Sequence, residues 1–164
     1  MIELTLIGVR VELPANQPIV LLKEREGERY LPIWIGSAEA QAIALALQGV
    51  TPPRPMTHDL MRNILEELGV SVERIVITEL REGTFFAVIQ MTRNGTRYEI
   101  SSRPSDAIAL AVRTSVPIFA NEDVLGEASI VIRDDEEQEV ERFREFLDQV
   151  SPEDFAGEEG PGQE

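Results

Sequence analysis

The sequence predicts a single α+β domain over residues 1–133, followed by an acidic tail over residues 134–164. Two observations carry this prediction. Several short segments alternate apolar and polar side chains as half-buried strands do, and some are separated by hairpin turn signals. Apolar helices stand between runs of strands instead of alternating regularly with them. We therefore expect a mixed or largely antiparallel sheet with three main helices.

The first strands are predicted from period-two alternation. Apolar side chains alternate along residues 2–13, and the phase changes at Gly8, which indicates a bulge in one long strand. Residues 19–22 and 30–35 then form a hairpin that turns around Gly27. We expect the first strand to lie at an edge of the sheet, where it favours a homodimer or higher oligomer.

Two helices follow this hairpin. The first covers residues 38–47, with Ser37 as its cap, and it is apolar on nearly every side, so it should be buried. The second covers residues 58–68, with Thr57 as its cap, after a proline-rich connection that cannot be helical. The remaining predicted elements are strands over 72–80, 85–91 and 97–101, a helix over 104–114, a strand over 116–120 and a helical turn over 121–125. The two hairpins among these strands turn at Glu82-Gly83 and at Asn94-Gly95, the stronger signal.

The net charge of −15 is concentrated at the C-terminal end. Residues 134–164 contain 13 acidic and two basic side chains, so residues 1–133 have a net charge of only −4. Apolar residues at helical spacing predict an amphipathic helix over about 137–150, and the last stretch should be disordered. An acidic chain ordinarily argues against nucleic acid as a partner, but this division removes most of that objection.

Composition excludes several classes of protein. Without cysteine, the chain has no disulfide scaffold, thiol nucleophile or cysteine-ligated metal, and its single histidine excludes a histidine-rich metal site. No apolar run approaches the roughly 20 residues that span a bilayer. The N-terminal residues resemble a strand and not a secretory signal. We expect a cytoplasmic protein with no membrane partner.

Acidic residues lie at the start of all three main helices: Glu39, Asp59 and Asp106. Because each helix follows a strand or an extended connection, their N-termini could converge at one edge of the sheet. Converging carboxylates suit Mg²⁺ or Mn²⁺, which we therefore expect as the cofactor. The alternative is structural, since acids in a first helical turn stabilise the helix by about 0.3–1 kcal/mol each.

Catalysis is assigned to His58, Asp59 and Asp106, because His58 is the side chain that titrates near neutrality. Arg54 and Arg103 are assigned to phosphate binding. Trp34, which has apolar neighbours, is interpreted as a core residue in preference to a base-stacking platform.

Three segments carry a family resemblance: Leu-Pro-Ile-Trp-Ile-Gly at 31–36 with Glu39 and Ala40, Pro-Arg-Pro-Met-Thr-His-Asp-Leu at 53–60, and Arg-Pro-Ser-Asp-Ala-Ile-Ala-Leu-Ala at 103–111. In this order and spacing, the chain resembles the bifunctional nuclease family from about residue 2 to residue 128. The tail over 143–155 resembles that of actinobacterial members. The resemblance implies an α+β domain and a divalent-metal-assisted nuclease that acts on RNA and DNA.

Two functions stay open at this point. The first is a nuclease with nucleic acid as its substrate. The second is a non-catalytic regulatory or assembly module, in which the polar residues fix the helix starts and the tail helix recruits a protein partner through residues 140–155.

Overall fold

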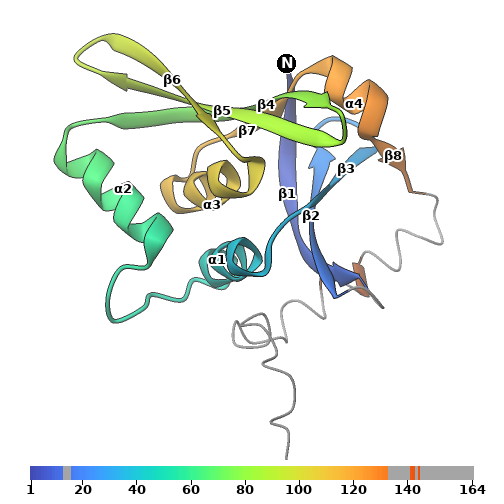
Figure 1. Cartoon of the computed structure of the whole chain (residues 1–164), viewed down its shortest axis with the longest axis horizontal. Coiled ribbons are helices and arrows are strands. Elements are labelled where there is room, and N and C mark those ends of the chain that lie inside the picture. Colours follow the sequence, from blue (N-terminus) through green and yellow to red (C-terminus); the bar gives the residue numbers. More distant parts are fainter. Residues whose placement is uncertain (13–15, 133–140, 143, 145–164) are drawn as a thin grey trace, which may run out of the picture.

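A computed structural model describes residues 1–12, 16–132, 141, 142 and 144. The described part contains one eight-stranded sheet, in the order β6-β5-β4-β7-β1-β2-β3-β8, and four helices (Figure 1). The elements are β1 (Ile2–Glu12), β2 (Gln17–Glu24), β3 (Arg29–Trp34), α1 (Ser37–Leu47), α2 (Thr57–Glu67), β4 (Ser71–Arg81), β5 (Thr84–Arg93), β6 (Thr96–Ser102), α3 (Pro104–Thr114), β7 (Ile118–Ala120), α4 (Glu122–Ala128) and β8 (Ile130–Val131). Every neighbouring pair of strands is antiparallel except β4 and β7, which are parallel. The α+β prediction with a largely antiparallel sheet is confirmed.

The local signals in the sequence correspond to local features of the sheet. The register of β1 against β2 shifts between Leu6 and Gly8, which confirms the bulge. The β5–β6 hairpin turns through Asn94 and Gly95 with φ angles of 50° and 77°. A two-residue hairpin turn whose twist matches that of its strands requires positive φ at both central positions.

The position of β1 is a correction. This strand was expected at an edge of the sheet, but it lies between β7 and β2 and pairs with both. The edges of the sheet in the described part are β6 and β8. The reason is a long-range pairing: β7, which follows α3, binds the first residues of β1, and period-two alternation carries no information about the partner of a strand.

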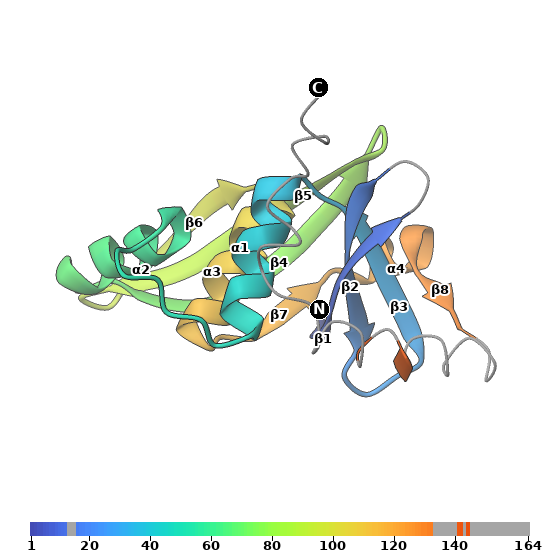
Figure 2. The same ribbon diagram turned by 90° about the horizontal axis from the view of Figure 1, so that it is seen from below.

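Helices α1, α2 and α3 lie on one side of the sheet, and α4 lies beyond β1–β3 on the other side (Figures 1 and 2). The similar alanine-rich segments of α1 and α3 pack against each other and form the centre of the core. Ile43, Ile108 and Leu110 are fully buried there. Small alanine side chains let the two helices approach the sheet and each other closely. This packing brings the starts of α1 and α3 into one region.

Helix α2 is less buried than α1 and α3. Met61 and Leu65 pack against the core, but Leu60, Ile64 and Leu68 are about half exposed. Its anchor is His58, the buried residue of the helix. Contacts of α2 with α3 therefore depend strongly on polar side chains, which are described below.

Further corrections concern single residues and ends. Ser37 and Thr57 are the first residues of α1 and α2 and do not cap them, because the backbone at Gly36 and Met56 is extended and takes the capping position. Trp34 is 57% exposed, so its assignment to the core is wrong. The predicted strand over 116–120 begins only at 118.

The predicted tail helix over 137–150 and the partner segment over 140–155 lie outside the described residues, apart from 141, 142 and 144. In the described part, no helix is long and apolar enough to cross a membrane.

Candidate functional site

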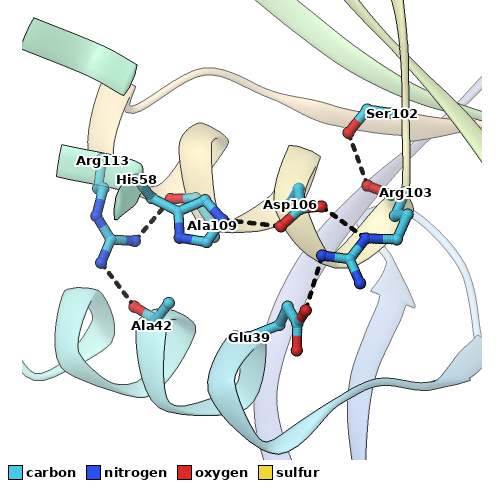
Figure 3. A network of polar contacts seen from close by, with 8 residues as sticks. All are labelled: Glu39, Ala42, His58, Ser102, Arg103, Asp106, Ala109 and Arg113. Carbon is cyan, nitrogen blue, oxygen red and sulfur yellow. Dashed lines mark hydrogen bonds and ion pairs between the residues drawn. The ribbon is translucent and has the colours of Figure 1, made fainter. Parts of the chain in front are cut away.

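The starts of the three main helices are brought together by one polar network. His58 Nε2 lies 2.9 Å from Asp106 Oδ1, which joins α2 to α3. Arg103, the residue before α3, donates from Nε to Asp106 Oδ2 at 2.8 Å. Its Nη2 lies 2.7 Å from Oε1 of Glu39, in the first turn of α1. We call these four residues the Arg103 network; Figure 3 shows them in this order.

Exposure increases from His58 through Asp106 to Arg103. The side chain of His58 is 9% exposed, that of Asp106 26% and that of Arg103 66%. Glu39 is 15% exposed. A buried histidine is thus connected through one carboxylate to an arginine that faces solvent.

The charges of the network are fixed by its hydrogen bonds. Burial alone would raise the pKa of Asp106, but the hydrogen bonds from Arg103 and His58 outweigh it and hold the pKa below its ordinary value. The hydrogen bond to Asp106, followed by the one to Glu39, raises the pKa of Arg103. Asp106 is therefore ionised at neutral pH, so His58 Nε2 is the donor of their hydrogen bond and Nδ1 is the nitrogen that can accept a proton.

Gly36 allows Glu39 to take its place in the network. A Cβ atom at Gly36 would collide with Oε2 of Glu39. Glycine therefore leaves the space in which the carboxylate folds back over the start of α1 and reaches Arg103.

Asp59 belongs to a second, separate contact. Its Oδ1 accepts a hydrogen bond from Nε of Arg113, in the last turn of α3, at 2.7 Å. Its Oδ2 accepts one from the backbone N–H of Met56 at 3.1 Å. Arg113 also donates from Nη1 to the carbonyl of Ala109 and from Nη2 to that of Ala42, both at 2.9 Å.

The Asp59–Arg113 pair is buried and connects all three helices. The side chain of Arg113 is 5% exposed and that of Asp59 is 14% exposed. Burial opposes ionisation of Asp59, but the bonds from Arg113 and Met56 together hold its pKa below the ordinary value. Sequence reasoning missed Arg113, although a basic residue in the last turn of a helix is a recognisable signal. Its geometry is that of a structural pair.

The carboxylates do not fit the metal site that the sequence analysis expects. Glu39 and Asp106 share the cation of Arg103, and Asp59 is bound by Arg113. Among the residues that the structure describes, no three His, Cys, Asp or Glu side chains are placed so that they could hold a metal ion. Arg54 lies exposed in the connection between α1 and α2, whereas the ion pairs of Arg103 are with Glu39 and Asp106.

Arg103 also lines a surface hollow that sequence reasoning missed. This hollow has a volume of about 280 Å³ and is formed by the end of β3, the β4–β5 turn and the start of α3. Trp34, the only tryptophan of the chain, lines it together with Phe85 and Arg103. An exposed indole beside an exposed guanidinium offers a stacking surface and a cation within one hollow.

Comparisons with known proteins identify relatives of the chain. The family model of the bifunctional nuclease domain matches residues 20–133, which include the Arg103 network, Trp34 and Arg113. An uncharacterized protein of Mycobacterium tuberculosis is 51% identical over 162 residues, which cover 93% of this chain and 97% of that protein.

Plant proteins are more distant. Bifunctional nuclease 1 of Oryza sativa subsp. indica is 29% identical over 109 residues, and bifunctional nuclease 1 of Arabidopsis thaliana is 29% identical over 111 residues. Each alignment covers 65% of this chain but only 33% and 34%, respectively, of the plant protein.

Proposed function

Because the chain belongs to the bifunctional nuclease domain family, we propose that it hydrolyses phosphodiester bonds of RNA and DNA at the Arg103 network. The relatives that bear the name bifunctional nuclease are plant proteins about three times as long as the segment they share with this chain. The nuclease activity in their name is therefore proposed, and not established, for this chain. The observation that supports it most is that Arg103 lines one hollow together with Trp34 and also binds Asp106, the hydrogen-bond partner of His58.

Arg103 binds a phosphate group in this proposal. Its contacts with Asp106 and Glu39 use Nε and Nη2, and its side chain is 66% exposed. A phosphate oxygen can therefore approach the remaining nitrogen, and arginine is suited to such contacts because its planar fork donates several hydrogen bonds. Trp34 stacks on a base next to that phosphate, a contact that contributes about 1–3 kcal/mol per base.

His58 acts as the general base in this proposal. Asp106 fixes the tautomer and the orientation of the imidazole through Nε2, as a carboxylate does in other histidine pairs. Nδ1 is then the atom that accepts a proton from the attacking water. The water oxygen bonds to phosphorus as the bond between phosphorus and the leaving sugar oxygen breaks, and that oxygen takes a proton from solvent. Asp59 has a positioning role, because it holds the start of α2, and with it His58, against α3 through Arg113.

Mg²⁺ or Mn²⁺ remains a separate part of the proposal, implied by the family and not by the side chains. No step above depends on a metal ion, since the three carboxylates do not form a ligand set. Addition and removal of the ions test this part on its own.

A second candidate function is favoured by the burial of His58. A histidine that is only 9% exposed, with carboxylates that are all paired with arginines, is also what a non-catalytic regulatory or assembly module would contain. In that case the network only locks α1, α2 and α3 together.

Cleavage of labelled single-stranded RNA and DNA distinguishes the two functions. The purified chain is assayed with Mg²⁺, with Mn²⁺ and with EDTA, beside His58→Gln, Arg103→Ala and a control, Arg93→Ala, an exposed arginine at the end of β5. A nuclease should lose about 100-fold in kcat in His58→Gln, as expected for a group that transfers a proton, with unchanged binding.

Binding without cleavage by the folded wild-type chain supports the second function. Equal cleavage by wild type and His58→Gln contradicts the catalytic assignment. Melting curves of each variant exclude loss of folding as the cause.

A further inference from the structure

Strand β6 (Thr96–Ser102) forms an open edge of the sheet. Among the described residues it pairs with β5 and with no other strand. Six of its seven residues are exposed, and the seventh, Ser102, is partly buried. An exposed edge strand presents unpaired N–H and C=O groups to another strand. Natural proteins blunt such edges with proline, a bulge or charged side chains. β6 contains no proline and its register with β5 is regular, and its charged side chains are one cation, Arg97, and one anion, Glu99.

Apolar side chains flank this edge on the side that carries the helices. Tyr98 pairs with Met91, and Ile100 pairs with Ile89. Residues paired across strands share one face of the sheet, and Ile89 and Met91 are part of the core. Tyr98 and Ile100 therefore lie on the helix-covered face, yet they are 45% and 48% exposed.

Helix α2 adds apolar residues on the same side of the sheet (Figure 2). Leu60, Ile64 and Leu68 are 49%, 49% and 54% exposed. Their spacing of four residues places them in one row along the helix surface. Both α2 and β6 thus carry large exposed apolar side chains on this side of the sheet, the kind of exposure that marks interaction surfaces.

The other face of β6 carries opposite charges two residues apart. Arg97 and Glu99 point to the face away from the helices, since they alternate with Tyr98 and Ile100. Glu99 is held in place by a hydrogen bond of 2.8 Å from Nε2 of Gln90 on β5. One edge thus offers one cation and one anion at spacing i, i+2, which is self-complementary.

We propose that two copies of this chain pair through β6, antiparallel and about a two-fold axis at Tyr98, so that the two sheets become continuous. In this register Arg97 lies opposite the partner's Glu99, and Glu99 lies opposite the partner's Arg97, while the two Tyr98 side chains meet on the axis. A two-fold axis perpendicular to the sheet keeps the apolar faces of both copies on the same side.

Neighbouring registers are less favourable. An axis at Glu99 would place the two Glu99 carboxylates directly opposite each other, and like charges in that position destabilise a sheet. An axis at Ile100 would place Glu99 opposite the partner's Ser101 and leave Arg97 without an anion. Charge complementarity therefore favours a second copy of the chain as the partner of β6, with the two-fold axis at Tyr98. This surface takes the place of the edge expected at residues 2–13, since β1 pairs with β2 along its length and with β7 at Ile2–Leu4.

Charge reversal tests the proposal by sedimentation equilibrium of the full chain over about 1–100 μM. Wild type should sediment with twice the 18.3 kDa chain mass. Arg97→Glu and Glu99→Arg should each weaken the dimer at least tenfold, because each places like charges opposite one another twice. The double variant Arg97→Glu/Glu99→Arg exchanges the two charges and should restore the dimer. Arg93→Glu makes the same charge change one strand away from the edge, and it should leave the dimer intact.

Three results would overturn the proposal. The first is a wild-type chain that stays monomeric at the highest concentration. The second is a dimer that Arg97→Glu does not weaken. The third is a double variant that remains monomeric although circular dichroism shows it to be folded. Because folding of each variant is measured directly, loss of structure cannot be mistaken for loss of pairing.

Discussion

Replacing Arg113 by alanine should destabilise the chain more than any substitution of an exposed arginine. The guanidinium makes three hydrogen bonds, to Asp59, to Ala42 and to Ala109. A buried hydrogen bond to a charged group contributes about 1.5–3 kcal/mol and one to a neutral carbonyl about 1 kcal/mol. The free energy of unfolding should therefore fall by about 3–5 kcal/mol, which is also the usual cost of removing one partner from a buried ion pair.

The melting temperature is the measurement. For a chain of this length, 1 kcal/mol corresponds to about 2–4 °C, so Arg113→Ala should melt about 6–20 °C below wild type by calorimetry. Asp59→Ala should show a decrease of similar size, because it leaves Arg113 buried without its anion. The double variant should lose much less than the sum, with a coupling free energy of about 1–3 kcal/mol.

The matched control is Arg93→Ala, which should change stability by less than about 0.5 kcal/mol. A decrease below about 3 °C for Arg113→Ala, or full additivity of the two single variants, would refute the assignment of a structural pair. Asp59 would then be available for the catalytic or metal-binding role that its position at a helix start suggests.

Three other predictions concern the Arg103 network and its surroundings. Trp34→Ala should weaken binding of single-stranded DNA about tenfold in a fluorescence anisotropy titration, as loss of one stacked base predicts, whereas Trp34→Phe should retain most of the binding. The pKa values of Asp59 and Asp106 lie below their ordinary values, so their contribution to stability is complete above about pH 4 and is lost as the pH falls through the lower folded values. Melting temperatures should therefore fall below pH 4, and less steeply in Asp106→Asn. Gly36→Ala should displace Glu39 from Arg103. The free energy of unfolding should fall by about 1 kcal/mol or less, since a surface ion pair contributes about 0–1 kcal/mol. Equal melting curves together with unchanged nucleic-acid binding would contradict a role for Glu39 in placing Arg103.

Local order could be predicted from the sequence because it depends on neighbouring residues. The period-two alternation of residues 2–13 with its break at Gly8, and the hairpin at Asn94, are properties of short segments, and the structure has them where expected. The pairing of β7 with β1 could not be predicted in this way. It depends on the path of the chain through α3, which periodicity does not encode.

The same distinction between local and long-range features applies to the candidate site. Polar residues at helix starts are visible in the sequence, and the structure joins Glu39, His58, Arg103 and Asp106 in one network. The partner of Asp59 was missed because Arg113 lies 54 residues away in the chain. Trp34 was misjudged because its apolar neighbours dominate the pattern, although it is the last residue of its strand and faces solvent.

Burial separates the functions of the two arginines, which otherwise have similar partners. Arg113 is 5% exposed and Arg103 is 66% exposed, and each binds a carboxylate at a helix start. An exposed ion pair contributes only about 0–1 kcal/mol to stability, so Arg103 can exchange a carboxylate for a phosphate group at little cost to the fold. Arg113 cannot, because its release would leave a buried carboxylate without its cation. The proposed substrate contact therefore belongs to Arg103, and the stability of the helix cluster that carries it belongs to Arg113.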